Sequence, residues 1–385
     1  MSNYYKVQLK KDISLYVHIP FCDHKCIYCD FYSIINLENK RYFLSSLKRE
    51  ISYFKKILEP ERYVTTIFFG GGTPSLMGPG FIHDILNIIH RNFEVSDKVE
   101  ITLETNPGTV NKEVLAQYRE SGINRLSIGV QSFHDKDLEF LTRIHTSTTA
   151  TQTVNYAAEA GFENINVDLI FNLPGQTKNE WLENLQRVVS LPVTHVSAYS
   201  LILERGTILN KMVLDGKVKI GDEDYDAELY ETTIDYLTSN NFIQYEISNF
   251  CKSGYECEHN LAYWNHKDYL GLGPSAHSFV NGKRWWNFSS LKRYISEIEK
   301  KENAIRGEEK LTSKELLEEF VMLALRSKGL DSTKLKSKFG ASWYESKKSI
   351  FQKLKNNGLL IWNNDFIKFT PKGYSLCDEI LLKIL

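Results

Sequence analysis

Short apolar runs alternate with longer amphipathic stretches over the first 200 residues of the chain. The apolar runs are nearly continuous and rich in β-branched and aromatic residues, as strands are when both faces of a parallel sheet are covered. The longer stretches repeat their apolar residues at helical spacing. The pattern predicts strands at 14–19, 65–70, 99–104, 125–130, 165–171 and 195–202. It predicts helices between them, among them 42–58, 81–93, 111–121 and 179–191.

Six strand–helix units predict an α/β fold, either a partial parallel (β/α)6 barrel or an open parallel sheet. In such folds the functional groups lie at the carboxyl ends of the strands. Polar or glycine-rich segments stand at these ends: Cys22, 70–75, 104–107, Gln131, Asp168 and 199–200. We therefore expect these segments to converge at one mouth of the sheet.

The rhythm changes after about residue 220. A helix is predicted at 222–239, an aromatic and turn-rich segment at 243–290, and an exposed helix or linker at 292–310. The last part has helices followed by a hairpin pattern around Asn363 and Asn364, an α+β order similar to a winged-helix module. These changes divide the chain into domains at 1–240, 241–310 and 311–385.

The composition is that of a soluble globular protein, with 42% hydrophobic and 25% charged residues among 385. A net charge of −1 argues against a polybasic nucleic-acid binder. The first 20 residues contain no signal-peptide core, and no apolar run approaches the roughly 18 residues that span a bilayer. Six cysteines are too few for a disulfide scaffold of this length. We expect a cytoplasmic protein whose clustered cysteines serve metal or redox chemistry.

Three of the six cysteines, Cys22, Cys26 and Cys29, stand in the order C-x3-C-x2-C directly after the first predicted strand. A thioredoxin-like pair would leave Cys22 unexplained. Structural zinc needs four ligands, and His24 as the fourth would strain the loop. A [4Fe–4S] cluster fits better, because three local thiolates leave one iron open to an external ligand.

This spacing after a first strand resembles the radical S-adenosylmethionine (SAM) superfamily. In that superfamily the open iron binds SAM, which the reduced cluster cleaves to a 5′-deoxyadenosyl radical. Motifs along nearly the whole chain resemble one group in it, the anaerobic coproporphyrinogen III dehydrogenase HemN and the heme chaperone HemW. The resemblance implies a radical SAM barrel followed by a winged-helix-like, HemN-type domain. The motifs are YVHIPFC, FFGGGTPS, ETNPG, RLSIGVQSF, LTRIH, DLIFNLPGQT, YSLILERGT and GLGPSAHSF.

The resemblance also implies which residues contact SAM. Residues matching the contacts of the cluster-bound SAM are Tyr16, Gly71 and Glu104. Residues matching contacts to the nucleoside or to a second SAM are Tyr28, Gly72, Thr73, Gln131, Arg143, Asp168 and Ser200. Carboxylates can accept hydrogen bonds from an ammonium or ribose, and an arginine can pair with a carboxylate. Taken singly, Arg143 could be a surface residue, and for Arg143 and Ser200 we favour a role other than binding. Asp168 could be a helix or turn cap, but for it and the other residues the shared place at strand ends favours function.

Two features separate the two branches of the group. The dehydrogenase carries a fourth cysteine, C-x3-C-x2-C-x-C, where this chain has Phe31. The segment HNLAYW at 259–264 matches the H-N-x-x-Y-W motif of HemW, whose members bind heme and hand it to acceptor proteins. The resemblance thus implies heme with His259 as its ligand, a heme-acceptor protein, and an electron donor if SAM is cleaved. A buried structural histidine is the alternative for His259, and the dehydrogenase is the alternative function.

A lysine-rich stretch suggests a second alternative. Residues 332–355 hold seven lysines against one acid, which would suit a radical SAM enzyme that modifies tRNA. The stretch has no arginine and few aromatic residues, which argues against base recognition. We favour a solvated face, and after it a weak attraction to anionic membrane lipid.

Overall fold

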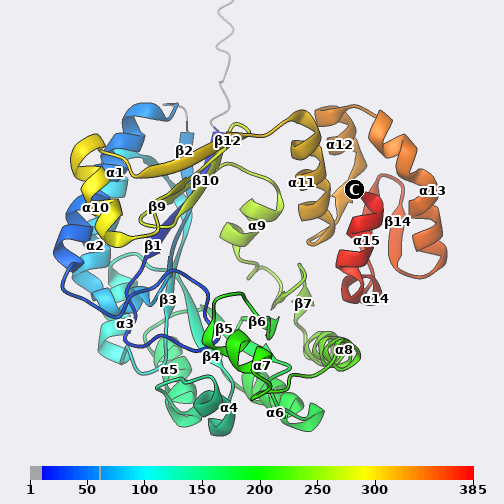
Figure 1. Cartoon of the computed structure of the whole chain (residues 1–385), viewed down its shortest axis with the longest axis horizontal. Coiled ribbons are helices and arrows are strands. Elements are labelled where there is room, and N and C mark those ends of the chain that lie inside the picture. The colour runs from blue at the N-terminus through cyan, green and yellow to red at the C-terminus, as the bar shows by residue number, and fades with distance from the viewer. Residues whose placement is uncertain (1–10, 60–61) are drawn as a thin grey trace, which may run out of the picture.

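The structure is a computed structural model that describes residues 11–59 and 62–385. Its centre is a sheet in which six parallel strands follow one another in sequence order (Figure 1). They are β1 (Lys11–Ile19), β2 (Arg62–Gly71), β3 (Glu94–Thr105), β4 (Arg125–Gln131), β5 (Asn164–Phe171) and β6 (His195–Ser200). All six predicted strands and their parallel arrangement are confirmed.

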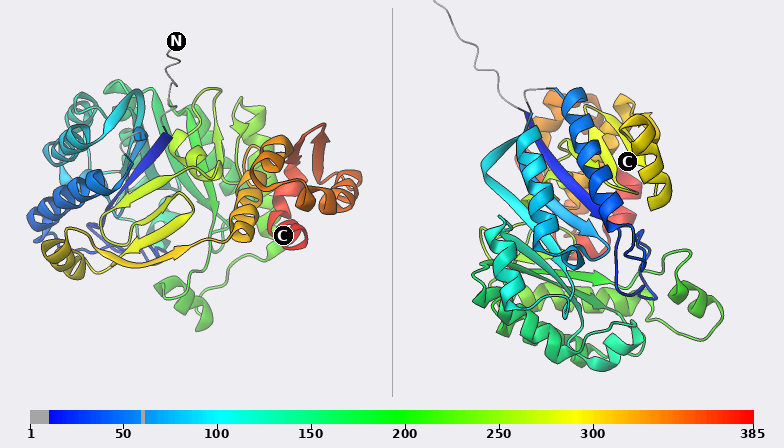
Figure 2. Two further views of the ribbon diagram at one scale, coloured as in Figure 1. Left: turned by 90° about the horizontal axis from the view of Figure 1, so that it is seen from above. Right: turned by 90° about the vertical axis from the view of Figure 1, so that its left-hand side faces the viewer.

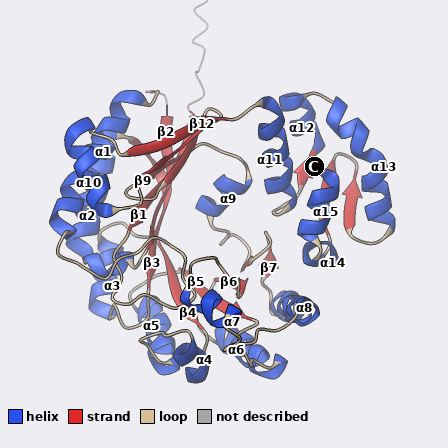
Figure 3. Cartoon of the chain, viewed as in Figure 1, coloured by secondary structure: helices blue, strands red, loops and turns tan. Residues whose placement is uncertain are grey.

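Helices cover the outer face of these strands (Figure 3). They are α1 (Lys40–Ile57), α2 (Pro79–Asn92), α3 (Lys112–Glu120), α4 (Asp135–Phe140), α5 (Ser147–Glu159), α6 (Lys178–Ser190) and α8 (Glu223–Ser239), with a 3-10 turn η1 (Pro74–Met77) after β2. Apolar strand residues such as Val17 and Ile67 pack in one buried core with Leu47 and Ile51 of α1. The short helix α7 (Ile208–Leu214) projects from the body (Figure 2).

The sheet continues beyond both edges of the parallel core. On one side β9 (Tyr269–Leu272) pairs in parallel with β1, and β10 (His277–Val280), β11 (Lys283–Asn287) and β12 (Ile305–Lys310) follow antiparallel. On the other side β8 (Asn249–Cys251) pairs antiparallel with β6, and β7 (Ile243–Gln244) with β8. Among the described residues the result is an open sheet of twelve strands, which runs across residue 240.

The stretch 292–310, expected to be an exposed helix or linker, contains a helix and a strand, and one face of the helix is buried. Helix α10 (Leu291–Lys301) packs on α1 and buries Leu291, Tyr294 and Ile298. These residues lie three and four positions apart, so they share one helix face. The charged residues between them hide this narrow apolar stripe in the sequence.

The C-terminal part forms an α+β unit with its own hydrophobic core (Figure 1, orange to red). Its helices are α11 (Ser313–Leu325), α12 (Ser332–Phe339), α13 (Ser342–Asn356), α14 (Pro371–Ser375) and α15 (Cys377–Ile384). Strands β14 (Leu360–Asn363) and β15 (Phe366–Phe369) form the predicted hairpin, and β13 (Leu330–Asp331) pairs with β15. Within the described ranges, no helix has both the length and the apolar character to cross a membrane.

Candidate functional site

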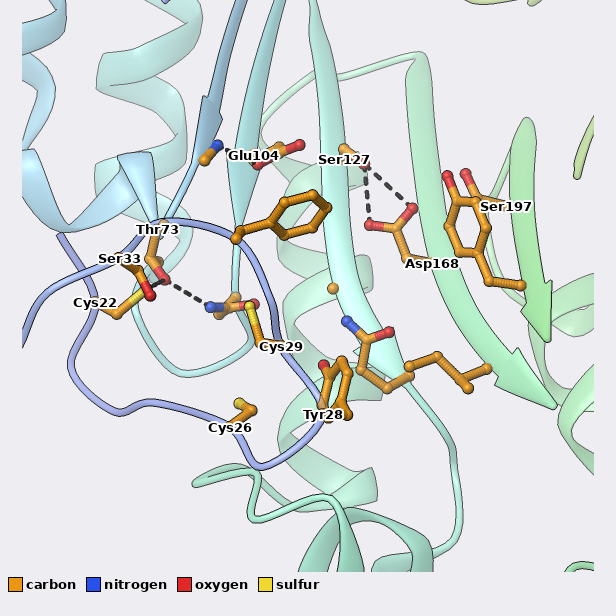
Figure 4. A pocket seen from close by; sticks show the side chains of 18 of the residues that line it. Cys22, Cys26, Tyr28, Cys29, Ser33, Thr73, Glu104, Ser127, Asp168 and Ser197 are labelled. Carbon is orange, nitrogen blue, oxygen red and sulfur yellow. Dashed lines mark hydrogen bonds between the residues drawn. The ribbon is translucent and has the colours of Figure 1, made fainter. Parts of the chain in front are cut away.

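A cavity of about 570 Å³ lies inside the curve of the parallel strands (Figure 4). Alternate residues of β4 and β5 face it, as side chains on one face of a strand do. The cavity brings together the three clustered cysteines and all predicted SAM residues except Tyr16. These lining residues are Cys22, Cys26, Tyr28, Cys29, Gly71, Gly72, Thr73, Glu104, Gln131, Arg143, Asp168 and Ser200.

The three cysteines come from the loop between β1 and α1. Backbone hydrogen bonds fix this loop to the end of β2: the Gly72 N–H donates to the Ile19 carbonyl at 2.8 Å, and the Thr73 N–H to the Phe21 carbonyl at 2.7 Å. The Cys22 N–H also donates to the Ile34 carbonyl at 2.9 Å. The chain therefore holds the cysteine loop in place with its own backbone.

A chain of side-chain hydrogen bonds joins two of the cysteines. The Thr73 hydroxyl donates to Cys22 Sγ at 3.7 Å and accepts from Asn106 Nδ2 at 2.8 Å. Arg143 Nη2 donates to Asn106 Oδ1 at 2.6 Å, and its Nη1 donates to Cys26 Sγ at 3.6 Å. Arg143 is thus a cavity residue and not a surface one. We predicted no role for Asn106 from the sequence, although it belongs to the motif ETNPG.

The glycines at the end of β2 are required by the protein's own packing. Gly71 has φ +113°, and a Cβ on it would lie 2.6 Å from His18 Cε1. A Cβ on Gly72 would lie 2.5 Å from the Phe21 carbonyl oxygen. The resemblance implied that both glycines contact SAM. The structure adds a reason within the protein itself, because a Cβ on Gly71 would collide with His18 of β1 and a Cβ on Gly72 with the backbone that leads into the cysteine loop.

His18 orients Tyr16 beside the cavity. His18 Nε2 donates to the Tyr32 carbonyl at 2.9 Å, so Nδ1 accepts from the Tyr16 hydroxyl at 3.1 Å. Burial raises the pKa of Tyr16, and the charge of Glu104 raises it further. Tyr16 therefore lies behind the lining, next to Glu104.

Two buried carboxyl groups face the cavity. Glu104 accepts from the Gly71 N–H at 3.1 Å, while Asp168 accepts from Asn166 Nδ2 at 2.7 Å and the Ser127 hydroxyl at 3.2 Å. Burial raises the pKa of Glu104 to about 8, with a further contribution from the charge of Asp168. Burial also raises the pKa of Asp168. A cationic group bound between them would favour their charged forms, so this part of the cavity suits an ammonium or sulfonium ligand.

The remaining predicted SAM residues also occupy the lining. Burial raises the pKa of Tyr28, which lies beside Arg143. Gln131 ends β4 with φ 70°, a left-handed conformation that turns the chain at the mouth. The Ser200 hydroxyl donates to Asp226 of α8.

The predicted heme ligand lies outside the cavity lining. His259, in helix α9 (Glu258–Trp264), is only 1% exposed. Its Nδ1 is 2.7 Å from the Thr66 hydroxyl and its Nε2 is 2.9 Å from the Tyr263 hydroxyl. Burial lowers the pKa of His259 to about 3. Both ring nitrogens are thus engaged, and of the segment 259–264 only Asn260 lines the cavity.

The donor set of the cavity fits a [4Fe–4S] cluster with three protein thiolates. Phe31, at the place of the fourth cysteine, has a 65% exposed side chain, and Cys251, Cys257 and Cys377 are buried away from the lining. In the described ranges no three His, Cys, Asp or Glu side chains are grouped to hold a single metal ion. A cubane cluster binds its thiolates at separate iron corners, so it does not require sulfurs that converge on one point.

Residues 16–188 match the model of the radical SAM superfamily, and residues 311–376 match the HemN C-terminal domain. The solved structure of coproporphyrinogen III oxidase (HemN) from Escherichia coli shares the fold, with a TM-score of 0.84 and 24% identity over 97% of this chain and 90% of that chain. The fold and the cysteine loop together define a radical SAM protein with a HemN-type C-terminal domain.

Comparison with curated proteins identifies a narrower family. The heme chaperone HemW of Bacillus subtilis is 35% identical over 95% of this chain and 97% of its own length. The proteins of the same name from Lactococcus lactis and Mycobacterium tuberculosis H37Rv are 35% and 32% identical, over 98% and 96% of this chain and 98% and 94% of their own lengths. The chain belongs to the HemW family.

Proposed function

We propose that this chain binds heme and transfers it to acceptor proteins, and that its cavity holds a [4Fe–4S] cluster and SAM. The observation that carries this proposal is the 35% identity, over 95% of the chain, to a protein named as a heme chaperone. Phe31 and the segment HNLAYW support it, because both match the HemW branch. The thiolate ligands favour a reducing compartment, so we place the protein in the cytoplasm.

In this proposal Cys22, Cys26 and Cys29 hold the cluster. Bound there, the cluster and SAM supply one-electron radical chemistry. The Thr73 hydroxyl and the Arg143 guanidinium donate hydrogen bonds to two of the three sulfurs, which orients the thiolates and stabilises their negative charge. Glu104 would accept hydrogen bonds from the ammonium of SAM. An electron donor is a partner if SAM is cleaved.

We also propose His259 as the heme ligand, on the family motif. Its two hydrogen bonds set a condition: Nε2 must leave Tyr263, or Nδ1 must leave Thr66, before a nitrogen can bind iron. Giving up one such bond costs about 1 kcal/mol. Heme binding through His259 therefore requires helix α9 to move or Tyr263 to rotate.

The dehydrogenase is the second candidate, since the chain shares its fold with HemN. The missing fourth cysteine argues against it. We expect little or no conversion of coproporphyrinogen III to protoporphyrinogen in an anaerobic assay with reductant and SAM. Turnover comparable to SAM cleavage would place the dehydrogenase first.

The tRNA-modifying alternative gains little from the lysine-rich stretch. Lys348 lies 2.6 Å from Glu345, and Lys336 lies 3.4 Å from Asp365 and over the ring of Tyr344. Part of the positive charge is therefore compensated within the domain. Contact of this face with anionic lipid stays a prediction.

Heme transfer is the direct test of the proposed function. The heme-loaded chain is mixed with an apo heme protein, and the visible spectrum is followed against the same amount of free hemin. We expect a complete shift to the acceptor's spectrum, at a rate that rises with acceptor concentration because transfer passes through a complex of the two proteins. A rate that is independent of acceptor concentration, as for passive release of heme followed by capture, would reject chaperone function.

A further inference from the structure

A buried arginine, Arg125, lies at the floor of the cavity and has no part in the proposed binding of the cluster or SAM. Arg125, Ser127, Gly129 and Gln131 face the cavity from alternate positions of β4. Arg125 and Gln131 are six positions apart along β4, so roughly 20 Å of strand separates Arg125 from the mouth of the cavity. In the strand register Glu104 lies opposite Ser127, one step closer to the mouth than Arg125. Arg125 therefore lies deeper than Glu104.

Arg125 is 2% exposed, and its Nε has no hydrogen-bond partner among residues 11–59 and 62–385. The charges of Glu100 and Asp168 act on the guanidinium, but neither carboxylate forms an ion pair with it in the described ranges. Both carboxylates are hydrogen-bonded to other groups. Glu100 accepts from the Glu258 and His259 N–H groups, both at 3.0 Å. Asp168 accepts from Asn166 and Ser127.

A buried cation without a hydrogen-bonded counter-charge is costly, and proteins rarely retain one without a use for it. Asn260 lines the same cavity, and its side-chain amide makes no hydrogen bond within the described ranges. A guanidinium fork and an amide N–H are the donors that recognise a planar carboxylate. The floor therefore offers an anion site built from a barrel strand and helix α9.

We propose that the cavity floor binds the carboxylate of a ligand, with Arg125 as its ion-pair partner and Asn260 as a second donor. Two ligands in this proposal carry such a group: heme, through a propionate, and SAM, through its amino-acid carboxylate. The heme case rests on the proposed function and would place heme inside the cavity. Asn260, the second residue of the HNLAYW segment, would then contact the heme directly.

The test uses the full chain with Arg125→Gln, Arg125→Lys and Asn260→Asp, and Arg187→Gln as an exposed control. Asn260→Asp is nearly isosteric, and its carboxylate would occupy Arg125 in place of the ligand. Thermal melting checks folding. Binding is measured by Soret titration with hemin and with hemin dimethyl ester, whose propionates are masked, and by anaerobic calorimetry with SAM.

If heme supplies the carboxylate, Arg125→Gln and Asn260→Asp weaken hemin binding about tenfold, Arg125→Lys retains most of it, and the ester binds all variants equally. If SAM supplies it, the same variants weaken SAM binding while hemin is unaffected. Unchanged binding of both ligands in folded Asn260→Asp and Arg125→Gln would overturn the proposal. Equal losses for hemin and its ester, without a loss for SAM, would also overturn it. If the wild type binds no hemin, the proposed function fails, and the SAM measurement still decides the role of Arg125.

Discussion

At the scale of single residues, the cavity is organised by contacts between side chains from different strands. Asn106 follows β3 and Arg143 lies between α4 and α5, yet they complete a hydrogen-bonded path from Cys26 to Cys22. The sequence alone identifies the cysteines because their spacing is local. It cannot reveal this path, or the unpaired Arg125, because both depend on which strands pair and in what register.

If three cysteines hold the cluster, substitutions of these three and of the other three cysteines should have different effects on iron content. Changing Cys22, Cys26 or Cys29 to Ala should abolish the cluster, since two thiolates do not hold a cube firmly. Cys377→Ala, in the C-terminal core, is the matched control and should keep full iron content. Iron and sulfide are assayed after anaerobic reconstitution. Full loading of Cys26→Ala would reject this assignment.

Gly71→Val is expected to destabilise the protein as well as impair SAM binding. The side chain would collide with His18 and force a left-handed backbone, at a cost of roughly 1–3 kcal/mol for the backbone alone. Gly161→Val is the control, because Gly161 has φ +86° and open space around it. Thermal melting should show the larger loss for Gly71→Val. Equal losses would mean that the contact with His18 is unimportant.

His259 and Tyr263 can be tested as a pair. If His259 binds heme after leaving Tyr263, His259→Ala should weaken or shift the Soret band, whereas Tyr263→Phe should bind hemin at least as tightly as the wild type. The phenylalanine removes the competing hydrogen bond and keeps the ring. A wild-type Soret band and affinity in His259→Ala would return the histidine to a packing role.

At the scale of elements, the long apolar strands were predictable because they are buried on both faces. The burial of helix α10 was not, because its apolar stripe is narrow and its burial depends on packing against α1. Strand β12 was also missed, because it is charged and lies at the edge of the sheet. Such elements are defined by their neighbours and not by their own pattern.

Glu50 joins several of these elements and predicts a pH dependence. It accepts from the Gly273 N–H at 2.8 Å, the Tyr294 hydroxyl at 2.7 Å and Asn287 Nδ2 at 2.6 Å. Burial raises the pKa of Glu50 from 4.5 to about 7. Its contribution to stability is therefore complete below pH 4.5 and is lost as the pH rises to 7, an effect on the order of 3 kcal/mol.

Glu50→Gln removes this titration. The difference in melting temperature, Glu50→Gln minus wild type, should increase from pH 5 to pH 8. A constant offset caused by the loss of the carboxyl group does not change this trend. Contributions from other titrating groups cancel in the difference. Parallel melting profiles of the two proteins across this range would show that Glu50 does not titrate there.

At the scale of the whole molecule, the fold does not distinguish a heme carrier from a dehydrogenase, because the HemN fold covers 97% of this chain. The distinction rests on a few residues, Phe31 and the HNLAYW segment with His259. The central claim is that one chain carries an iron–sulfur cluster and also binds heme.

The visible spectrum of the anaerobically purified chain, before and after addition of hemin, tests this claim most directly. We expect the broad absorption of a [4Fe–4S] cluster at the start and, after hemin, a saturable Soret band at a defined stoichiometry, with the cluster absorption retained. A chain that shows the cluster but gives only the spectrum of free hemin would disprove heme binding.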